Sequence, residues 1–364
     1  MNDSDTFFCM LHSILAAYGL QHDQCTIVPF GTGLINHTWK IESGNDAFIL
    51  QRINDNVFKQ PQDIASNINK LSGFLKKTHP DYLFVAAVPS LDGKDAVHDA
   101  QEGWFRLLPF IKNSFTYDVV SSTKAAYEAA RQFGRFTRLL SCFDAAQLHN
   151  TLPHFHDLSL RYQQFEKAIL EGNSARINQS NNSIKFLQEH KNIVDTYEVI
   201  CSNNAFKKRV THHDTKISNV LFDAADKGLC VIDLDTVMRG YFISDVGDMM
   251  RTYLSPVSEE DEDISKIEIR EDYFKAIAAG YLSEMNAELT DEEKKAFVYA
   301  GTFMIYMQAL RFLTDYLNND VYYGARYEGH NLNRANNQIN LLQKLLQKEA
   351  VLSKAVLADT ANSV

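Results

Sequence analysis

The 364-residue chain is poor in cysteine, and no two cysteines stand at C-x-x-C spacing. Its five cysteines are dispersed at Cys9, Cys25, Cys142, Cys201 and Cys230. An odd, scattered set does not form the disulfide framework typical of small secreted domains, and it does not supply a cysteine metal site. We therefore expect free thiols in a reducing compartment and place the protein in the cytoplasm.

The sequence also has no long apolar run, and we expect no export leader. Residues 7–20 are largely apolar, but Asp3 and Asp5 precede them and no Lys or Arg does, unlike a signal peptide. The apolar residues recur at helical spacing, which predicts an amphipathic helix over residues 5–19. No run reaches the length that spans a bilayer, so we expect no membrane partner.

An excess of positive charge is missing as well. The formal net charge is −10 and the sequence pI about 5.6, which argues against nucleic acid as the main partner. A bound nucleotide needs only a few local cations and is not excluded. The hydrophobic content of 45% and charged content of 23% are typical of a globular protein, and the length suffices for two lobes.

One constellation of polar residues stands out. Residues 212–219 follow the pattern H-x-D-x-K-x-x-N with Asp214, Lys216 and Asn219, and a short apolar run then leads to Asp233 and Asp235. Phosphoryl transfer from a nucleoside triphosphate requires an aligned hydroxyl and cations against the phosphates, and kinases use these residue types in this order. The pattern therefore predicts a kinase site.

Chemistry assigns a role to each residue. Asp214 would accept a hydrogen bond from the acceptor hydroxyl, and Lys216 would reach the γ-phosphate as a point charge. Asn219 and Asp233 would give oxygen ligands to Mg²⁺, and Asp235 would be a further metal ligand or touch the acceptor. Apolar runs at 220–222 and 230–232 predict a hairpin that places Asn219 beside Asp233. The alternative is a surface hairpin with polar ends.

The chain divides into a β-rich part and a helical part. We expect an α+β, two-lobed protein-kinase-like fold, with a small antiparallel-sheet lobe over residues 1–112 and a mainly helical lobe over residues 113–364. The acidic run at 258–263 reads as a solvated loop. Strands are expected at 25–30, 38–43, 47–53, 83–88 and 103–111, and helices at 61–77, 122–141, 158–171, 183–202, 243–254, 270–287, 291–318 and 331–348.

Several residues of the first lobe are candidates for binding ATP. Gly31, Thr32 and Gly33 lie between two strands, where glycines let backbone N–H groups approach phosphates. Arg52 is the cation of strand 48–53, although helix 61–77 has no Glu to pair with it. Adenine would lie near Phe110 and Ile111. Asn36, where the last Gly of a protein-kinase loop would stand, is assigned to the substrate side.

The segments FILQRIN (48–54), WFRLLPFI (104–111), FGRF (133–136), THHDTKISNVLFD (211–223) and VIDLDTVMRGYFISDVGDMMR (231–251) carry a family resemblance. The chain resembles the aminoglycoside phosphotransferase-like and choline kinase-like small-molecule kinases. Its closest likeness is to bacterial N-acetylhexosamine 1-kinases, through RFLTDYLNNDVYY (311–323) and HNLNRA (330–335).

The resemblance implies specific roles. Asp214 would be the base, Asn219 and Asp233 would hold Mg²⁺, and the product would be the 1-phosphate of N-acetylglucosamine or N-acetylgalactosamine. It also implies that Asp245, Gly247 and Asp248 support the catalytic loop, while helix capping remains an alternative.

The acceptor side is expected in the last third of the chain. Arg311 and Tyr322 occupy positions that look like sugar contacts of the hexosamine kinases, although Arg311 could instead pair with Asp315 along one helix. Phe155-His156-Asp157 with Arg161 favours a capped helix start over a metal site. Two other functions stay open, a kinase of another small alcohol (choline, ethanolamine, homoserine or an aminoglycoside) and a nucleotide-binding pseudokinase. The sequence does not indicate an oligomeric state.

Overall fold

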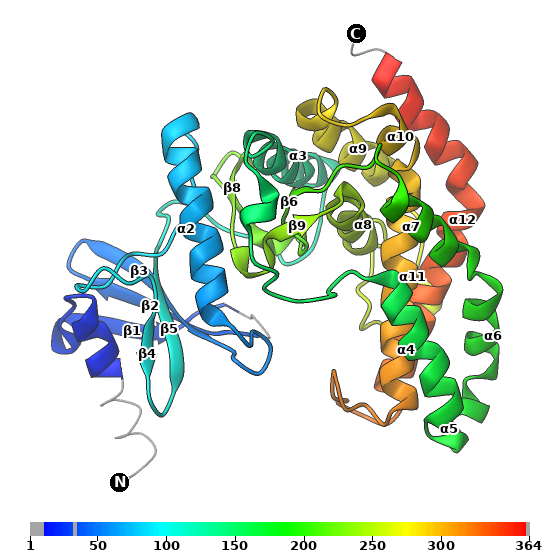
Figure 1. Cartoon of the computed structure of the whole chain (residues 1–364), viewed down its shortest axis with the longest axis horizontal. Coiled ribbons are helices and arrows are strands. Elements are labelled where there is room, and N and C mark those ends of the chain that lie inside the picture. The colour runs from blue at the N-terminus through cyan, green and yellow to red at the C-terminus, as the bar shows by residue number, and fades with distance from the viewer. Residues whose placement is uncertain (1–10, 32–34, 362–364) are drawn as a thin grey trace.

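The computed structural model describes residues 11–31 and 35–361. A β-sheet with one long helix forms the N-terminal part, and a larger helical part follows it along the chain (Figure 1). This mixed architecture, with an antiparallel sheet before a helical lobe, confirms the predicted fold class. None of the helices within the described ranges is long and apolar enough to cross a membrane.

The N-terminal sheet is antiparallel and five-stranded, in the order β1-β2-β3-β5-β4. One of its faces buries Ile41, Leu50 and Phe105 against a helix that includes residues 11–17. The opposite face looks toward the rest of the molecule. The strands and the first long helix are β1 (Cys25–Pro29), β2 (His37–Ser43), β3 (Asp46–Ile53), β4 (Val97–Asp99), β5 (Gly103–Pro109) and α2 (Pro61–Thr78).

The predicted strand at 83–88 is wrong. Strand β5 already has β3 on one edge and β4 on the other, so the segment reaches the sheet only through Val88, which pairs with Leu107. The segment is instead an extended connection after α2. Its Val85 packs into a small apolar cluster with Leu221 and Cys230 of the second lobe.

The second lobe is built from helices, most of which lie where the sequence predicts them. The expected helix 183–202 is split around residues 190–191, and the expected helix 291–318 is split at Ala296. The helices are α3 (Thr123–Leu139), α4 (Leu158–Glu171), α5 (Ser174–Gln179), α6 (Asn181–Glu189), α7 (Asn192–Ser202), α8 (Phe242–Tyr253), α9 (Glu271–Met285), α10 (Asp291–Lys295), α11 (Phe297–Leu317) and α12 (His330–Ala361).

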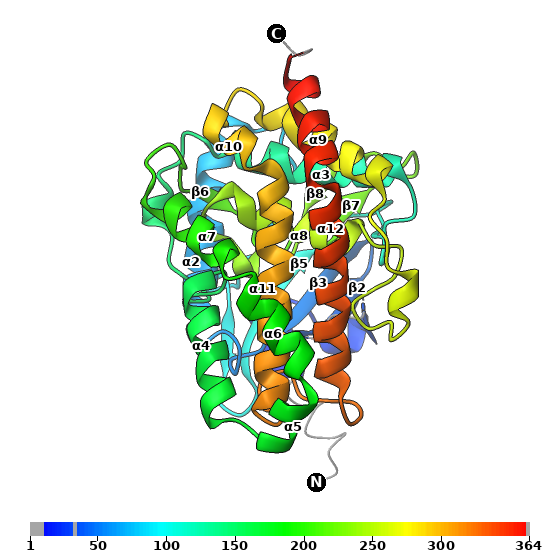
Figure 2. The same ribbon diagram turned by 90° about the vertical axis from the view of Figure 1, so that its right-hand side faces the viewer.

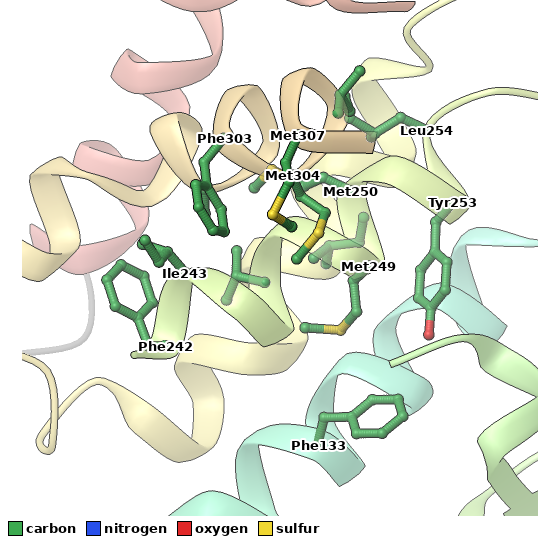
Figure 3. Close-up of a cluster of buried hydrophobic side chains, with 14 of the residues drawn as sticks. Phe133, Phe242, Ile243, Met249, Met250, Tyr253, Leu254, Phe303, Met304 and Met307 are labelled. Carbon is green, nitrogen blue, oxygen red and sulfur yellow. The ribbon is translucent and has the colours of Figure 1, made fainter. Parts of the chain in front are cut away.

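The core of this lobe forms around α8. Met249, Met250 and Tyr253 of α8 are fully buried among side chains of α3 and α11 (Figure 3). The two helices α8 and α11 touch closely because Gly247 carries no side chain. A Cβ at that position would lie 2.3 Å from the carbonyl oxygen of Ala300. Helices α4 and α12 run lengthwise on either side of α11, which is almost wholly buried between them (Figure 2).

Short strands interrupt the helices and carry the candidate site. The predicted hairpin is present as β7 (Val220–Phe222) and β8 (Gly228–Val231), with Val220 paired to Val231. A second small sheet pairs β6 (Arg209–Thr211) with β9 (Met238–Gly240) and was not expected. Three-residue turns of 3-10 helix follow β6 and β8, namely η3 (Ile217–Asn219) and η4 (Leu234–Thr236).

Candidate active site

The backbone of the predicted catalytic loop is held by α8. The two carboxylate oxygens of Asp245 accept hydrogen bonds from the N–H groups of His212 (3.1 Å) and His213 (2.7 Å). Asp248 accepts one from the N–H of Thr215 at 2.8 Å. Burial raises the pKa of Asp245 to about 7, even though the two N–H groups lower it. These contacts agree with a supporting role for Asp245 and Asp248, whereas Gly247 serves helix packing.

His212 connects this loop to the strand that precedes Asp233. Its Nε2 lies 2.9 Å from the carbonyl oxygen of Ile232, and the N–H of Asp214 donates to its Nδ1 at 3.3 Å. Because a carbonyl only accepts, Nε2 carries the proton and the imidazole is neutral. Burial lowers the pKa of His212 in agreement with this form. The rings of Phe133 and Phe136 of α3 meet the imidazole in T-shaped contacts.

Asp214 is accessible and has two polar neighbours. Its carboxylate lies 3.1 Å from Nζ of Lys216 and accepts a hydrogen bond of 3.0 Å from the amide of Asn219. The side chain is 20% exposed. Desolvation by itself would raise the pKa of Asp214. The positive charge of Lys216 and the hydrogen bonds that Lys216 and Asn219 donate outweigh this effect, so the pKa lies below its ordinary value. The group is therefore an ionised hydrogen-bond acceptor near neutral pH.

Asn219 and Asp233 lie together, as the hairpin predicts. The N–H of Ile232 donates to the carbonyl oxygen of Asn219 at 2.9 Å, and Asp233 follows in a left-handed conformation with φ 59°. The amide nitrogen of Asn219 is used by Asp214, and no hydrogen bond within the described ranges uses its side-chain oxygen. Desolvation, followed by the charges of Asp235 and Asp214, raises the pKa of Asp233 to about 7. The Asp233 side chain nonetheless keeps an exposed surface that a cation can reach.

These features fit a magnesium site with few protein ligands. Among the described residues, no three His, Cys, Asp or Glu side chains lie close enough together to hold a metal ion by themselves. Mg²⁺ is commonly bound by one or two carboxylates and completes its shell with water and substrate phosphates. One carboxylate and one amide oxygen, from Asp233 and Asn219, match that pattern.

The structure contradicts the assignment of Asp235 as a metal ligand. Its side chain is only 2% exposed and forms an ion pair with Arg106 of β5. The other carboxylate oxygen accepts a hydrogen bond of 2.8 Å from Asn36, which was expected on the substrate side. Both oxygens are thus used by N-terminal residues, and neither Asp235 nor Asn36 is directed to a ligand. Together they join the two lobes.

Arg52 does not lie on the cleft side of the sheet. It pairs with Glu102 at 2.7 Å, and its cross-strand neighbour is Phe105, which is buried under the N-terminal helix. Side chains alternate along a strand, so Gln51 takes the opposite face. There Gln51 accepts hydrogen bonds from Arg106 at 2.8 and 3.0 Å. The buried cation near the catalytic hairpin is therefore Arg106, one strand away from the expected position.

The expected nucleotide region is described in part. Gly31 has φ +76° and open space around its Cα, as a phosphate-binding turn requires, while Thr32 and Gly33 lie outside the described residues. The ring of Phe110 meets Phe30 edge-on at 5.9 Å and has Nζ of Lys40 at 4.6 Å. Ile111 packs beside Leu221 in the apolar cluster shared by both lobes. An apolar surface of this kind suits an adenine ring.

The acceptor candidates Arg311 and Tyr322 are close to each other. The guanidinium carbon of Arg311 lies 5.9 Å from the ring centre of Tyr322, 5.4 Å from Tyr323 and 5.6 Å from Phe155. The alternative ion pair with Asp315 does not form. Asp315 instead accepts hydrogen bonds from the N–H groups of Tyr322 (2.7 Å) and Tyr323 (2.9 Å) and fixes the turn that carries both rings.

The acidic run at 258–263 is not simply a solvated loop. Glu259 forms ion pairs with Arg251 of α8 and with Arg334 of α12, the latter at 2.6 Å. Glu260 lies 2.7 Å from Nε2 of His330 and 3.1 Å from Nε of Arg334. Arg251 also pairs with Asp248 at 2.9 Å, so the loop is tied to the support of the catalytic residues.

Sequence reasoning missed Arg106, Gln51 and the partners of Glu259. Arg106 carries a readable signal, because it stands inside the apolar stretch 104–111 and a buried arginine requires an anionic partner. The partner itself is not readable, since Asp235 is far away in the sequence. Gln51 carries no signal beyond its place on a strand.

Comparison with known proteins agrees with this geometry. A sequence model described as "Phosphotransferase enzyme family" matches residues 26–284. A microcompartment-associated aminopropanol kinase has a similar structure, with a TM-score of 0.62, 16% identity, and coverage of 95% of this chain and 98% of that chain. An aminoglycoside phosphotransferase of Alicyclobacillus acidocaldarius matches with a TM-score of 0.63 and 10% identity, and the match covers 95% of this chain and 96% of that chain. A choline kinase of Cryptosporidium parvum matches with a TM-score of 0.55 and 14% identity, and the match covers 99% of each chain. At these identities the structural matches speak for the fold.

Proposed function

We propose a substrate and a mechanism from one premise: this chain belongs to the phosphotransferase enzyme family. It is a small-molecule phosphotransferase that acts on an alcohol group. We propose ATP with Mg²⁺ as the phosphoryl donor and the anomeric hydroxyl of N-acetylglucosamine or N-acetylgalactosamine as the acceptor. The observation that carries the chemistry is the accessible, ionised Asp214 between Lys216 and Asn219. The proposal places nucleotide binding in residues 1–112 and acceptor binding in residues 113–364.

In this mechanism Asp214 orients the acceptor hydroxyl and receives its proton as the new O–P bond forms, while the bond between the γ-phosphorus and the oxygen that bridges it to the β-phosphate breaks and ADP leaves. Lys216 is 50% exposed at the edge of the site and offers its charge to the transferred phosphoryl group. Asn219 and Asp233 would hold Mg²⁺, which neutralises phosphate charge when bound. The loop backbone is fixed by Asp245 and Asp248, so little reorganisation is needed at the moment of transfer.

The acceptor surface supports a sugar over two competing classes. A quaternary ammonium such as choline would need an aromatic cage, but the cation among the rings of Phe155, Tyr322 and Tyr323 is the protein's own Arg311. A polycationic aminoglycoside would need an acidic wall, but the acidic residue Glu259 is neutralised by Arg251 and Arg334. Guanidinium and flat aromatic faces suit a sugar with a polar substituent.

The test is turnover with Mg-ATP against a panel of amino sugars, with the product detected by its mass shift. We expect Asp214→Asn to lower kcat by about 100- to 10,000-fold, the usual contribution of a positioned proton acceptor. The affinity for ATP should stay nearly unchanged, because Asp214 is not a nucleotide contact in this mechanism.

The control is Asp81→Asn, which removes an equal charge at an exposed position and should leave turnover as it is. Transfer to choline or ethanolamine with none to any amino sugar would replace the proposed acceptor. Full activity of the Asp214 variant would end the proposed mechanism.

A further inference from the structure

Two arginines beside the acceptor rings differ from most other arginines of the protein. Neither Arg161 nor Arg311 has a carboxylate oxygen within 4.0 Å among the described residues. Arg135, Arg239 and Arg270 also lack one, but Arg135 lies over the ring of Tyr82, Arg239 is exposed to solvent, and three carbonyl oxygens satisfy Arg270. Those that do pair with a carboxylate are Arg52, Arg106, Arg131, Arg138, Arg176, Arg209, Arg251, Arg326 and Arg334.

Both guanidinium groups border residues 154–156. Arg161, in the first turn of α4, donates to the carbonyl oxygen of His154 at 3.0 Å, and Arg311 of α11 lies over the ring of Phe155. Desolvation first, and then the positive charge of Arg311, lowers the pKa of Arg161. The two cations therefore repel each other in a partly dehydrated place.

The nearby carboxylates have other tasks. Asp157 accepts hydrogen bonds from the N–H of Leu160 and lies 2.9 Å from Nδ1 of His154, while Asp315 is used by backbone N–H groups. One terminal nitrogen of Arg161 donates to the side-chain oxygen of Gln164 at 2.9 Å, and its Nε is buried with no hydrogen-bond partner among the described residues. Arg311 makes one side-chain hydrogen bond, at 3.2 Å to Gln308. Several strong donors are thus left for a ligand.

The arginine pair is connected to the catalytic loop. The ring of Phe155 stacks on His156 with centres 4.3 Å apart, and Nδ1 of His156 lies 3.3 Å from Nδ1 of His213, the residue before Asp214. Desolvation lowers the pKa of both imidazoles, so neither ring adds positive charge at neutral pH. Phe155, His156 and His213 thus link the arginine pair, through direct side-chain contacts, to the residue before Asp214.

We propose that Arg161 and Arg311 form a subsite for an oxyanion carried by the acceptor, so that acidic derivatives of the proposed N-acetylhexosamines, phosphorylated at the same anomeric hydroxyl, are preferred over the neutral sugars. This inference rests on the proposed function and adds a substrate class to it. Two planar guanidinium groups recognise carboxylates and phosphates through paired, charge-assisted hydrogen bonds, and the aromatic rings around Arg311 hold it in place. The unpaired charges supply the binding energy.

The experiment compares kcat/KM for three acceptors of the whole protein with Mg-ATP. They are N-acetylglucosamine, N-acetylmuramic acid, which adds a lactyl carboxylate, and N-acetylglucosamine 6-phosphate. We expect one of the two acids to exceed the neutral sugar by about 10- to 100-fold, the effect of a charge-assisted pair. The acid with the higher kcat/KM identifies the preferred anion as a carboxylate or a phosphate.

Variants assign the preference to the two residues. Arg161→Gln should lower kcat/KM for the acidic substrate to that for the neutral sugar, while kcat/KM for the neutral sugar stays within about threefold of the wild-type value. Arg311→Gln should also remove the preference, and it should lower kcat/KM for both acceptors because Arg311 is a proposed contact of the sugar itself. Arg161→Lys retains charge and should keep part of the preference if the Gln variant is unstable. Arg239→Gln, an exposed arginine on β9, is the matched control and should change nothing.

The two proposals fail in different ways. If kcat/KM is equal for neutral and acidic sugars, in the wild type and in both Gln variants, the subsite is overturned and the kinase proposal is left intact. If no sugar is phosphorylated, the proposed function fails, and calorimetric titration with N-acetylmuramic acid and with N-acetylglucosamine 6-phosphate still tests the subsite. Binding of neither acid by the wild type, or equal binding by the wild type and Arg311→Gln, would overturn it as well.

Discussion

At the scale of single residues, His213 shows how tightly the catalytic loop is built. Its backbone is left-handed, with φ 68°, a conformation that a residue with a side chain adopts at a cost of about 1 kcal/mol. The ring is accommodated because residue 240 is a glycine. A Cβ at Gly240 would stand 2.4 Å from Cε1 of His213 and 2.6 Å from its Nε2.

Gly240→Ala should therefore displace His213 and, with it, Asp214. We expect kcat to fall by about 10- to 100-fold, as small misplacements of reacting groups do, with little change in the ATP dissociation constant. The control is Gly73→Ala in α2, where a Cβ meets nothing within 4 Å and should keep or raise stability. Steady-state kinetics and nucleotide titration of both variants provide the check, and an unchanged kcat in the Gly240 variant would contradict it.

At the scale of residues, the sequence predicts which side chains meet when those residues are close together along the chain. The spacing of Asp214, Lys216 and Asn219 within one loop, and a short hairpin to Asp233, determine which groups meet. Asp235 was misassigned because its partners come from the other lobe, and contacts of that kind leave no local spacing to read.

At the scale of elements, the loop 258–263 acts as a brace between helices. Glu259 joins Arg251 of α8 to Arg334 of α12, and Asn337 of α12 donates to the carbonyl oxygens of Ser258 and Asp261. A run of acidic residues usually indicates a solvated segment, and the arginines that neutralise this one lie on two helices distant in sequence. The pattern of charges alone therefore could not reveal the brace.

Glu259→Gln should lower the free energy of unfolding by about 2 kcal/mol at pH 7, because two guanidinium groups lose a charged acceptor. Desolvation raises the pKa of Glu259, but Arg251 and Arg334 outweigh it, so the folded-state pKa is below the ordinary 4.5. The stabilisation is thus full above pH 4.5 and is lost as the pH falls through the folded-state value.

Denaturant titrations of wild type and variant from pH 3 to pH 7 would show this, with a difference that narrows toward the acid end. Glu268→Gln, at an exposed position nearby, should have no such effect. A difference that stays constant over the whole range would exclude the ionised pairings as its source.

At the scale of the whole molecule, two sets of polar contacts join the lobes. Arg106 and Asn36 bind Asp235, and Asn67 in the middle of α2 exchanges hydrogen bonds with His149 and donates to the carbonyl oxygen of Val237. Helix α2 accordingly lies between the sheet and the second lobe (Figure 1). The order of strands and helices along the chain predicts two lobes. It does not predict which residues hold the lobes together, because those residues are far apart in the sequence.

Asp235→Asn should leave Arg106 buried without its counter-charge and lower the free energy of unfolding by about 3–5 kcal/mol. Replacing both residues, as Arg106→Leu with Asp235→Leu, should recover part of that loss, because an apolar pair needs no charge balance. Thermal melts of the three proteins measure this, and small-angle scattering reports whether the lobes separate. Equal melting temperatures for the wild type and Asp235→Asn would remove the ion pair as a joint between the lobes.

The buried pair of Arg106 and Asp235 also has a bearing on how such sequences diverge. Either residue without the other destabilises the fold, so substitutions at the two sites should occur together. Related chains should have either the charged pair or two apolar residues at these positions. A related chain that keeps only one of the two residues would need a different contact between the sheet and the second lobe. Such a contact would indicate that the two lobes of that chain are oriented differently.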